Sequence, residues 1–138
     1  SWIRHGSWYP DVKLRLFHRE KGAWGGSNPH DKLILNPNTT AEHLSGDLLH
    51  YTYYSEKEHR ERTFKYANIS AQALLNKGQK ALFFQPYISS AARFLKEYIL
   101  RLGLLDAKNG WVISKTTAWG TFQKYKILIH LHHQKKQV

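Results

Sequence analysis

The pattern of apolar residues changes near Ser55, and this change limits the possible folds more than any other feature of the chain. Before Ser55, short runs that alternate apolar and polar residues are separated by Gly, Asn and Pro. A period of two is typical of half-buried strands. After Ser55, apolar residues recur every three or four positions, as on one face of a helix. The sequence therefore predicts an α+β chain, with a short strand-rich N-terminal unit followed by three amphipathic helices.

Three strands are predicted before Ser55. Their sequences are "VKLRLFHR" (12–19), "KLIL" (32–35) and "LLHYTYY" (48–54), which alternate or are rich in β-branched and aromatic residues. Between the first two, "GAWGGSNP" (22–29) has the composition of an irregular loop.

The helical part begins with a capping-box spacing, because Glu58 follows Ser55 by three residues. The first helix is expected to stop at "NKG" (76–78). A second follows Pro86 and ends near Gly103, with its apolar and charged residues on different sides. A turn at "DAKNG" (106–110) precedes the third, and the tail "HLHHQKKQV" (130–138) is expected to fray. We predict two parts, residues 1–54 and residues 55–138.

The net charge, the cysteine content and the absence of certain motifs limit the classes of function that the chain can have. The net charge of +11, from 21 Lys and Arg against 10 Asp and Glu, indicates an anionic partner: nucleic acid, a phospholipid surface or a phosphate-bearing substrate. The absence of cysteine excludes a disulfide scaffold, a thiolate zinc site and a cysteine nucleophile. No P-loop, G-x-G-x-x-G or G-x-S-x-G motif is present. The chain starts at Ser1 and has no Met, so we expect it to be part of a longer protein.

His30 and Asp31 are the first candidates for chemistry. An imidazole can ligate a divalent metal, and an adjacent carboxylate can take a proton from an attacking hydroxyl. The same pair would also suit the solvated lip of a loop. The His-rich tail, by contrast, lies at a basic terminus with no carboxylate or thiolate beside it, so adventitious metal affinity is the simpler interpretation.

Two basic, aromatic regions are further candidates. Arg4, His5, Trp8 and Arg15 lie in "WIRHGSWYPDVKLRLF", where aromatic faces among cations suit sugar stacking with phosphate pairing, or single-stranded nucleic acid. A strand with core aromatics and solvated cations would give the same pattern. The basic helices with their Trp, Tyr and Phe suit a lipid headgroup surface, or are ordinary solvated faces. No apolar run reaches the roughly 18 residues of a spanning helix, so we expect membrane contact to be peripheral.

Five stretches in one order resemble the C-terminal half of bacterial family 2 glycosyltransferases, in the branch associated with lipopolysaccharide core biosynthesis. They are "WIRHGSWYPDVKLRLFHR", "GGSNPHDKL", "LLHYTYYS", "RFLKEYILRLGLLDAKNGWVIS" and "FQKYKIL". The resemblance implies an inverting, metal-dependent transferase of the GT-A fold, working at the cytoplasmic face of the cell membrane. Its partners would be a nucleotide-sugar donor, a lipid-linked or glycan acceptor and the anionic membrane, rather than nucleic acid.

The resemblance also implies residue roles. The strands before residue 54 would belong to a GT-A core sheet, with Asp31 as general base and His30 as a metal or diphosphate contact. By their positions in the resembling stretches, the residues that would bind substrate or diphosphate are Arg4, His5, Trp8 and Arg15. The main carboxylate ligands of the Mg²⁺ or Mn²⁺ ion would lie outside this chain, in a donor-binding half.

One position departs from the family pattern. The family usually has Asp-Gly where this chain has Asp106-Ala107. If that glycine serves a turn with positive φ, Ala107 would be strained there.

The rival hypothesis for the function is a non-catalytic basic module that binds nucleic acid or anionic membrane through its helices.

Overall fold

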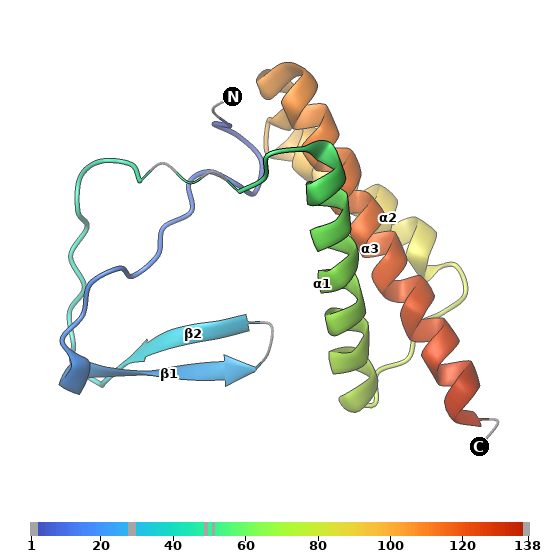
Figure 1. Cartoon of the computed structure of the whole chain (residues 1–138), viewed down its shortest axis with the longest axis horizontal. Helices are drawn as coiled ribbons and strands as arrows, with labels where there is room; N and C mark the ends of the chain where they lie inside the picture. Colours follow the sequence, from blue (N-terminus) through green and yellow to red (C-terminus); the bar gives the residue numbers. More distant parts are fainter. Residues whose placement is uncertain (1–2, 28–29, 49, 51, 137–138) are drawn as a thin grey trace. The chain divides into compact units, whose positions relative to one another are not determined.

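The computed structural model describes residues 3–27, 30–48, 50 and 52–136 (Figure 1). The chain forms two compact units: a helical unit, made of residues up to Asp11 and from Tyr53 onward, and a hairpin unit, made of residues 12–52. The described elements are η1 (Arg19–Lys21), β1 (Gly22–Ser27), β2 (His30–Leu35), α1 (Glu56–Asn76), α2 (Gln85–Leu95), η2 (Lys96–Leu100), η3 (Gly103–Asp106) and α3 (Ala107–Lys136). The predicted α+β class, with strands before three helices, is confirmed.

The hairpin unit contains a two-stranded antiparallel sheet in which Trp24 pairs with Leu33 and Gly26 with Asp31. The prediction of a loop at 22–29 is wrong for residues 22–27, which form β1. At Gly25 the end of the Ile34 side chain occupies the space that a Cβ would need, since a Cβ there would lie 2.7 Å from Cδ1 of Ile34. The glycine-rich composition therefore makes room for a side chain of the partner strand.

Two predicted strands do not form. Residues 12–18 have no regular secondary structure, and Val12 and Leu16 are largely exposed. The alternation of "VKLRLFHR" has no effect because no described strand pairs with it, and a lone strand leaves its backbone groups unpaired. The described residues of 48–54 are also not a strand, since Tyr53 packs against aromatic side chains of the helical unit. Leu49 and Tyr51 lie outside the described residues.

α1 starts where the capping box predicts. The Ser55 hydroxyl accepts a hydrogen bond from the N–H of Glu58 at 3.1 Å, and the Glu58 carboxylate accepts one from the N–H of Tyr54 at 3.0 Å. The first bond satisfies an N–H group that the helix itself leaves without a partner, and the second fixes the residue before the N-cap. The helix ends at Asn76, and Gly78 follows with φ +71°.

α3 lies between α1 and α2 and packs against both (Figure 1). At the α1 contact a Cβ on Gly120 would lie 2.5 Å from Cγ2 of Thr63, so the missing side chain sets the close approach of the two helices. Leu128 is the largest fully buried apolar side chain of the described residues. At the α2 contact the Trp111 ring meets Phe94 and Tyr98 edge to face, at 5.2 and 5.4 Å between centroids.

Both ends of α3 differ from the prediction. The helix starts at Ala107, within the predicted turn at 106–110, and continues through Lys136. The predicted fraying of residues 130–138 is therefore wrong for residues 130–136. A tertiary contact accounts for this, because Nε2 of His132 lies 2.7 Å from the backbone oxygen of Gln79 and must donate to it. This bond ties the end of α3 to the loop between α1 and α2.

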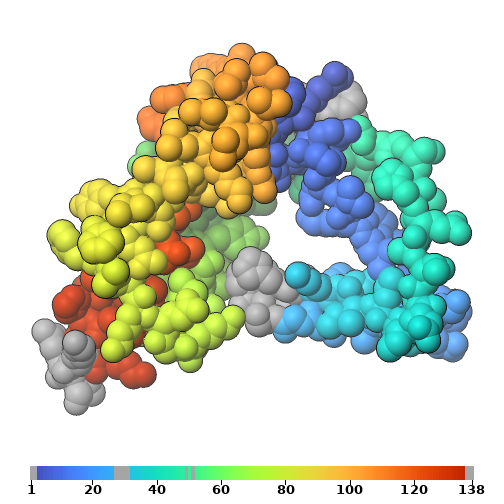
Figure 2. Space-filling view, turned by 180° about the vertical axis from the view of Figure 1, so that it is seen from behind, coloured from blue at the N-terminus to red at the C-terminus, as the bar shows by residue number. Residues whose placement is uncertain are grey.

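The inward side of α2 and η2 includes a charged residue, Glu97, beside the aromatic residues that contact α3. Glu97, in the π-helical turn η2 that continues α2, is 1% exposed, and Arg93 is half-buried. Ile88 and Leu95 lie on the opposite side and are 61% and 51% exposed. The alternative of a solvated charged face on this helix is thus wrong for Glu97. These two apolar side chains face outward, and Figure 2 shows the yellow α2 segment at the surface of the helical unit.

Candidate functional site

The carboxylate of Asp106 holds the loop that contains two of the predicted site residues. It accepts hydrogen bonds from the N–H groups of Arg4 at 3.2 Å and His5 at 2.9 Å, and Nδ1 of His5 lies 3.1 Å from Oδ1. Its side chain is 8% exposed. Hydrogen bonds from backbone N–H groups to an ionised carboxylate are strong, so Asp106 fixes the backbone of this loop at Arg4 and His5. Two of the five resembling stretches therefore meet at Asp106.

Ala107 adopts a conformation that suits glycine. Its φ is +48° and its ψ is −130°, a region that is costly for a residue with a Cβ. The position is the one at which the sequence departs from the Asp-Gly of the resembling family. The backbone thus has the positive φ that glycine would serve, although the side chain present is alanine.

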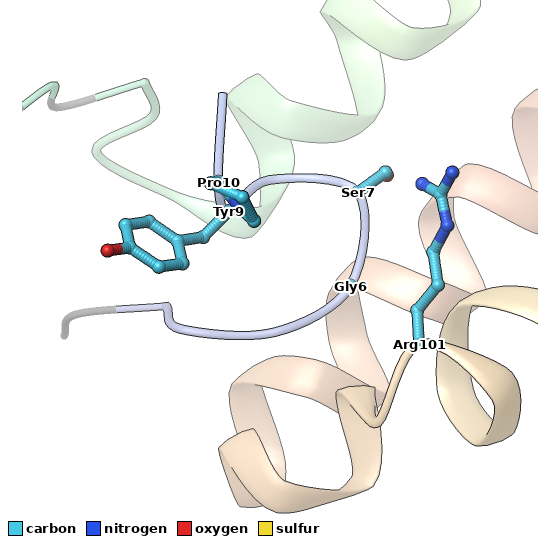
Figure 3. A pocket seen from close by; sticks show the side chains of 5 residues that line it. All are labelled: Gly6, Ser7, Tyr9, Pro10 and Arg101. Atoms are coloured by element: carbon cyan, nitrogen blue, oxygen red, sulfur yellow. The ribbon is translucent and has the colours of Figure 1, made fainter. Parts of the chain in front are cut away.

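The loop after His5 borders a hollow of about 420 Å³ within the helical unit. Gly6, Ser7, Tyr9, Pro10 and Arg101 line it (Figure 3). The Gly6 N–H donates to the backbone oxygen of Arg101 at 2.9 Å, and the φ of Gly6 is +78°. The Ser7 side chain points toward the Arg101 guanidinium, whereas the Tyr9 ring points away from it. A hydroxyl and a guanidinium side by side can donate to an oxygen-rich ligand.

Near Gly6 of the loop lies the buried carboxylate of Glu97, which two partly exposed arginines contact. Oε1 of Glu97 is 3.3 Å from Nε of Arg93 and 3.5 Å from Nη1 of Arg101. Oε2 of Glu97 has no hydrogen-bond partner among the described residues and is 3.7 Å from where a Cβ on Gly6 would stand. The two arginines compensate the buried carboxylate, so the network links α2 to the loop at Gly6.

Trp8 belongs to an aromatic cluster rather than to the hollow. The Tyr53 ring stacks on His59 at 4.3 Å between centroids, and the Trp8 ring meets His59 edge to face at 5.5 Å. Burial lowers the pKa of His59, which is 7% exposed. Burial also raises the pKa of Tyr53, against an opposing effect of the nearby Arg62 guanidinium. Burial therefore disfavours the charged form of His59. Trp8 has a packing role, and its predicted substrate contact stays a prediction.

Arg15, His30 and Asp31 lie in the hairpin unit, apart along the chain from Arg4, His5 and Trp8 in the helical unit. In the β-ladder His30 is opposite Ser27, and Asp31 is opposite Gly26, whose φ is +112°. The side chains of His30 and Asp31 lie outside what the structure describes. Arg15 is exposed in the irregular segment before η1.

The described residues contain no group of three or more His, Asp or Glu side chains that could hold a metal ion. The side chain of His30, the predicted metal contact, lies outside the described part of the structure. The expectation that the main metal ligands lie outside this chain stays a prediction.

None of the helices within the described part of the chain is both long enough and apolar enough to cross a bilayer.

Comparison with known proteins gives no assignment: no protein-family model matches the chain, and no solved structure matches it.

Sequence reasoning treated Asp106 as a turn residue and Glu97 as one charge on a charged helix side. A signal for Glu97 was available, because Arg93 and Arg101 precede and follow it by four residues, the spacing of ion pairs along one helix face. A signal for Asp106 was weaker. Its partners lie 101 and 102 residues earlier, and no local pattern reports such a contact.

Proposed function

We propose that this chain is the C-terminal portion of an inverting glycosyltransferase of the family 2 type, which transfers a sugar from a nucleotide-sugar to a lipid-linked or envelope glycan acceptor. The observation that carries the proposal is the positive φ of Ala107 beside Asp106, at the one turn where the resembling family has glycine. The family's glycine implies a turn with positive φ at this position, and the backbone of Ala107 has a positive φ. This agreement does not depend on helix or strand propensity. The contact of Asp106 with Arg4 and His5 adds that two resembling stretches pack together.

In the proposed reaction Asp31 takes the proton from the acceptor hydroxyl. The hydroxyl oxygen then forms a bond to the anomeric carbon of the sugar from the face opposite the diphosphate, and the bond from that carbon to the diphosphate oxygen breaks. A sugar hydroxyl is a poor nucleophile at neutral pH, which is why a base is needed. Cations stabilise the departing diphosphate. Arg4 and Arg15 are the proposed contributors from this chain.

A divalent metal, Mg²⁺ or Mn²⁺, would add positive charge at the diphosphate, held chiefly by ligands outside this chain, with His30 as a contact. We place the enzyme at the cytoplasmic face of the cell membrane, where a lipid-linked acceptor would be reached by peripheral binding.

The test uses the longer protein that the proposal requires, with Asp31→Asn as the variant. Loss of the base should lower the transfer rate by about 10²–10⁴-fold, while nucleotide-sugar affinity stays within twofold of wild type. Asp47→Asn is the matched control, since it makes the same substitution at an exposed position of the same hairpin unit. Transfer at the wild-type rate by Asp31→Asn would refute the assignment of the base.

The second candidate is a non-catalytic basic module that binds anionic membrane or nucleic acid. The outward apolar side of α2 favours it, because glycosyl transfer itself does not need such a surface. Titrations of the longer protein with a nucleotide-sugar, anionic vesicles and single-stranded RNA separate the candidates, because the proposed donor-binding half lies outside this chain. Tight RNA binding that falls steeply with salt, with no affinity for the nucleotide-sugar, would favour the module over the enzyme.

A further inference from the structure

The outward side of α2 carries an unbroken apolar stripe, which we define as Phe84, Ile88, Leu95 and Ile99. Ile88 and Leu95 are seven residues apart in α2, a spacing that places them on one helix face. Phe84 is the N-cap residue of α2, and Ile99 lies in the π-helical turn η2 that continues it. All four are at least half exposed, and the small residues Ala91 and Ala92 between them are exposed as well. Figure 2 shows this segment, in yellow, at the surface of the helical unit. Such a contiguous patch marks an interaction surface.

Further large apolar side chains extend the stripe at both ends. Phe83 precedes α2 and is 82% exposed, and Leu100, at the end of η2, is 77% exposed. Leu104 and Leu105 of η3 are also exposed. Exposed apolar side chains thus occur along the chain from the loop before α2 to the turn that leads into α3.

The charge around the stripe identifies its partner. From Arg62 to Val138 the sequence has 13 Lys and Arg but only two acidic residues, Glu97 and Asp106. The side chains of both acids are buried, at 1% and 8% exposed. Lys80, Lys96, Arg101 and Lys108 are exposed along the same segment. The stripe therefore has cations around it and no exposed carboxylate from residue 62 onward in the described part of the chain.

We propose that this stripe docks on an anionic lipid bilayer, with α2 lying in the interface plane and its apolar side chains at the boundary between headgroups and acyl chains. A helix with one apolar face and flanking Lys and Arg binds such a surface through both buried area and charge. A second copy of the chain fits less well, because it would bring like charges together. The ion pairs of Arg93 and Arg101 with the buried Glu97 carboxylate hold Glu97 inward, so Ile88 and Leu95 stay outward without lipid. The inference deepens the membrane part of the proposed function and needs no glycosyl transfer.

The binding test measures flotation of the whole chain with vesicles of phosphatidylcholine and phosphatidylglycerol. Leu95→Glu should weaken partitioning roughly tenfold or more, because it removes apolar area and adds a negative charge at the membrane surface. Leu44→Glu makes the same substitution at a 67% exposed position of the hairpin unit and should change partitioning by less than about twofold. Equal losses in the two variants would overturn the stripe as the docking surface.

A second measurement does not depend on how well Leu95→Glu folds. The chain has no cysteine, so Ile88→Cys and Leu44→Cys each accept one environment-sensitive fluorophore. The label at position 88 should shift to the blue with anionic vesicles and not with pure phosphatidylcholine, while the label at position 44 should not shift. No shift at position 88, a shift on self-association without lipid, or a position 88 already covered in a longer protein would each overturn the proposal.

The two proposals fail separately. In the longer protein, Leu95→Glu should lose vesicle binding but keep transfer to a soluble acceptor, and Asp31→Asn should lose transfer but keep vesicle binding. Tight RNA binding that Leu95→Glu leaves unchanged, together with no vesicle binding by wild type, would overturn the membrane inference.

Discussion

The carboxylate of Asp106 binds the backbone N–H of His5 at 2.9 Å and its ring nitrogen at 3.1 Å, across 101 residues of sequence. This relationship joins the first described residues of the chain to the turn before α3. It also positions the loop that borders the hollow at Gly6 and Arg101. The stability of this loop can be tested without any assumption about catalysis.

Asp106→Ala should loosen the loop. It removes acceptors for two backbone N–H groups, and we expect a destabilisation of about 1–3 kcal/mol. The amides of Arg4 and His5 should exchange with solvent faster, as hydrogen exchange can measure. Asp47→Ala, at an exposed position of the hairpin unit, is the control and should change neither quantity. Unaltered exchange at Arg4 and His5 would mean that the Asp106 contacts do not hold the loop.

Ala107→Gly should stabilise the protein, which is unusual for a substitution at the start of a helix. Glycine accepts φ +48° without the steric cost that alanine has, and we expect a gain of about 1 kcal/mol after the entropy lost by the unfolded chain is counted. Ala91→Gly on the exposed side of α2 should instead cost about 1 kcal/mol. Chemical denaturation measures both. Destabilisation of similar size in the two variants would contradict a strained Ala107.

Gly110→Ala should be severely destabilising. A Cβ at this position would collide with the backbone oxygen of Gly103, and backbone atoms cannot turn aside as a side chain can. We expect a loss of at least about 3 kcal/mol, at the upper end of overpacking costs. Lys108→Ala, two residues earlier and exposed, should change stability by less than about 0.5 kcal/mol. A thermal melt of the two variants decides between close packing and open space at Gly110.

Stability should fall as the pH is lowered because of His59. Its pKa is lowered in the folded state by burial, so the unfolded chain takes up a proton at a higher pH than the folded chain. The contribution is present above the unfolded value of about 6.5 and is lost as the pH falls through the lower folded value. His59→Phe keeps an aromatic ring against Tyr53 and should flatten the change in melting temperature between about pH 7.5 and pH 5. His43→Phe, at an exposed site, should leave the pH profile as in wild type.

The features that sequence could predict are local ones. The cap at Ser55 and Glu58 depends on residues three apart, and the stop at 76–78 on a glycine that takes positive φ. The strand at 32–35 forms within β2 because its apolar residues find a partner only a few residues away. In each case the interaction that decides the structure lies within a short window of sequence.

The features that sequence missed depend on distant partners. The alternation of residues 12–19 predicts a strand, but no described strand supplies the ladder. The glycines of 22–27 predict a loop, but Ile34 of β2 fills the space above Gly25. The sequence shows that α2 has an apolar side and a charged side. It does not show that Glu97 on the charged side is buried, where it pairs with Arg93 and Arg101.

The structure gives local surroundings for three of the predicted site residues, whose binding roles stay predictions. Arg4 and His5 do lie in a constrained loop, but its anchor, Asp106, is remote in sequence. Trp8 packs with Tyr53 and His59, which residue spacing could not indicate. The roles of His30, Asp31 and Arg15 stay predictions from the resemblance.

The most direct test of the proposed function is the configuration of the product's new glycosidic bond. The longer protein that contains this chain is incubated with a nucleotide-sugar and an acceptor, and proton NMR of the product gives the anomeric configuration. Direct displacement at the anomeric carbon predicts a configuration opposite to that of the donor. A product that retains the donor configuration, or no glycoside at all under conditions where the nucleotide-sugar is bound, would contradict an inverting glycosyltransferase.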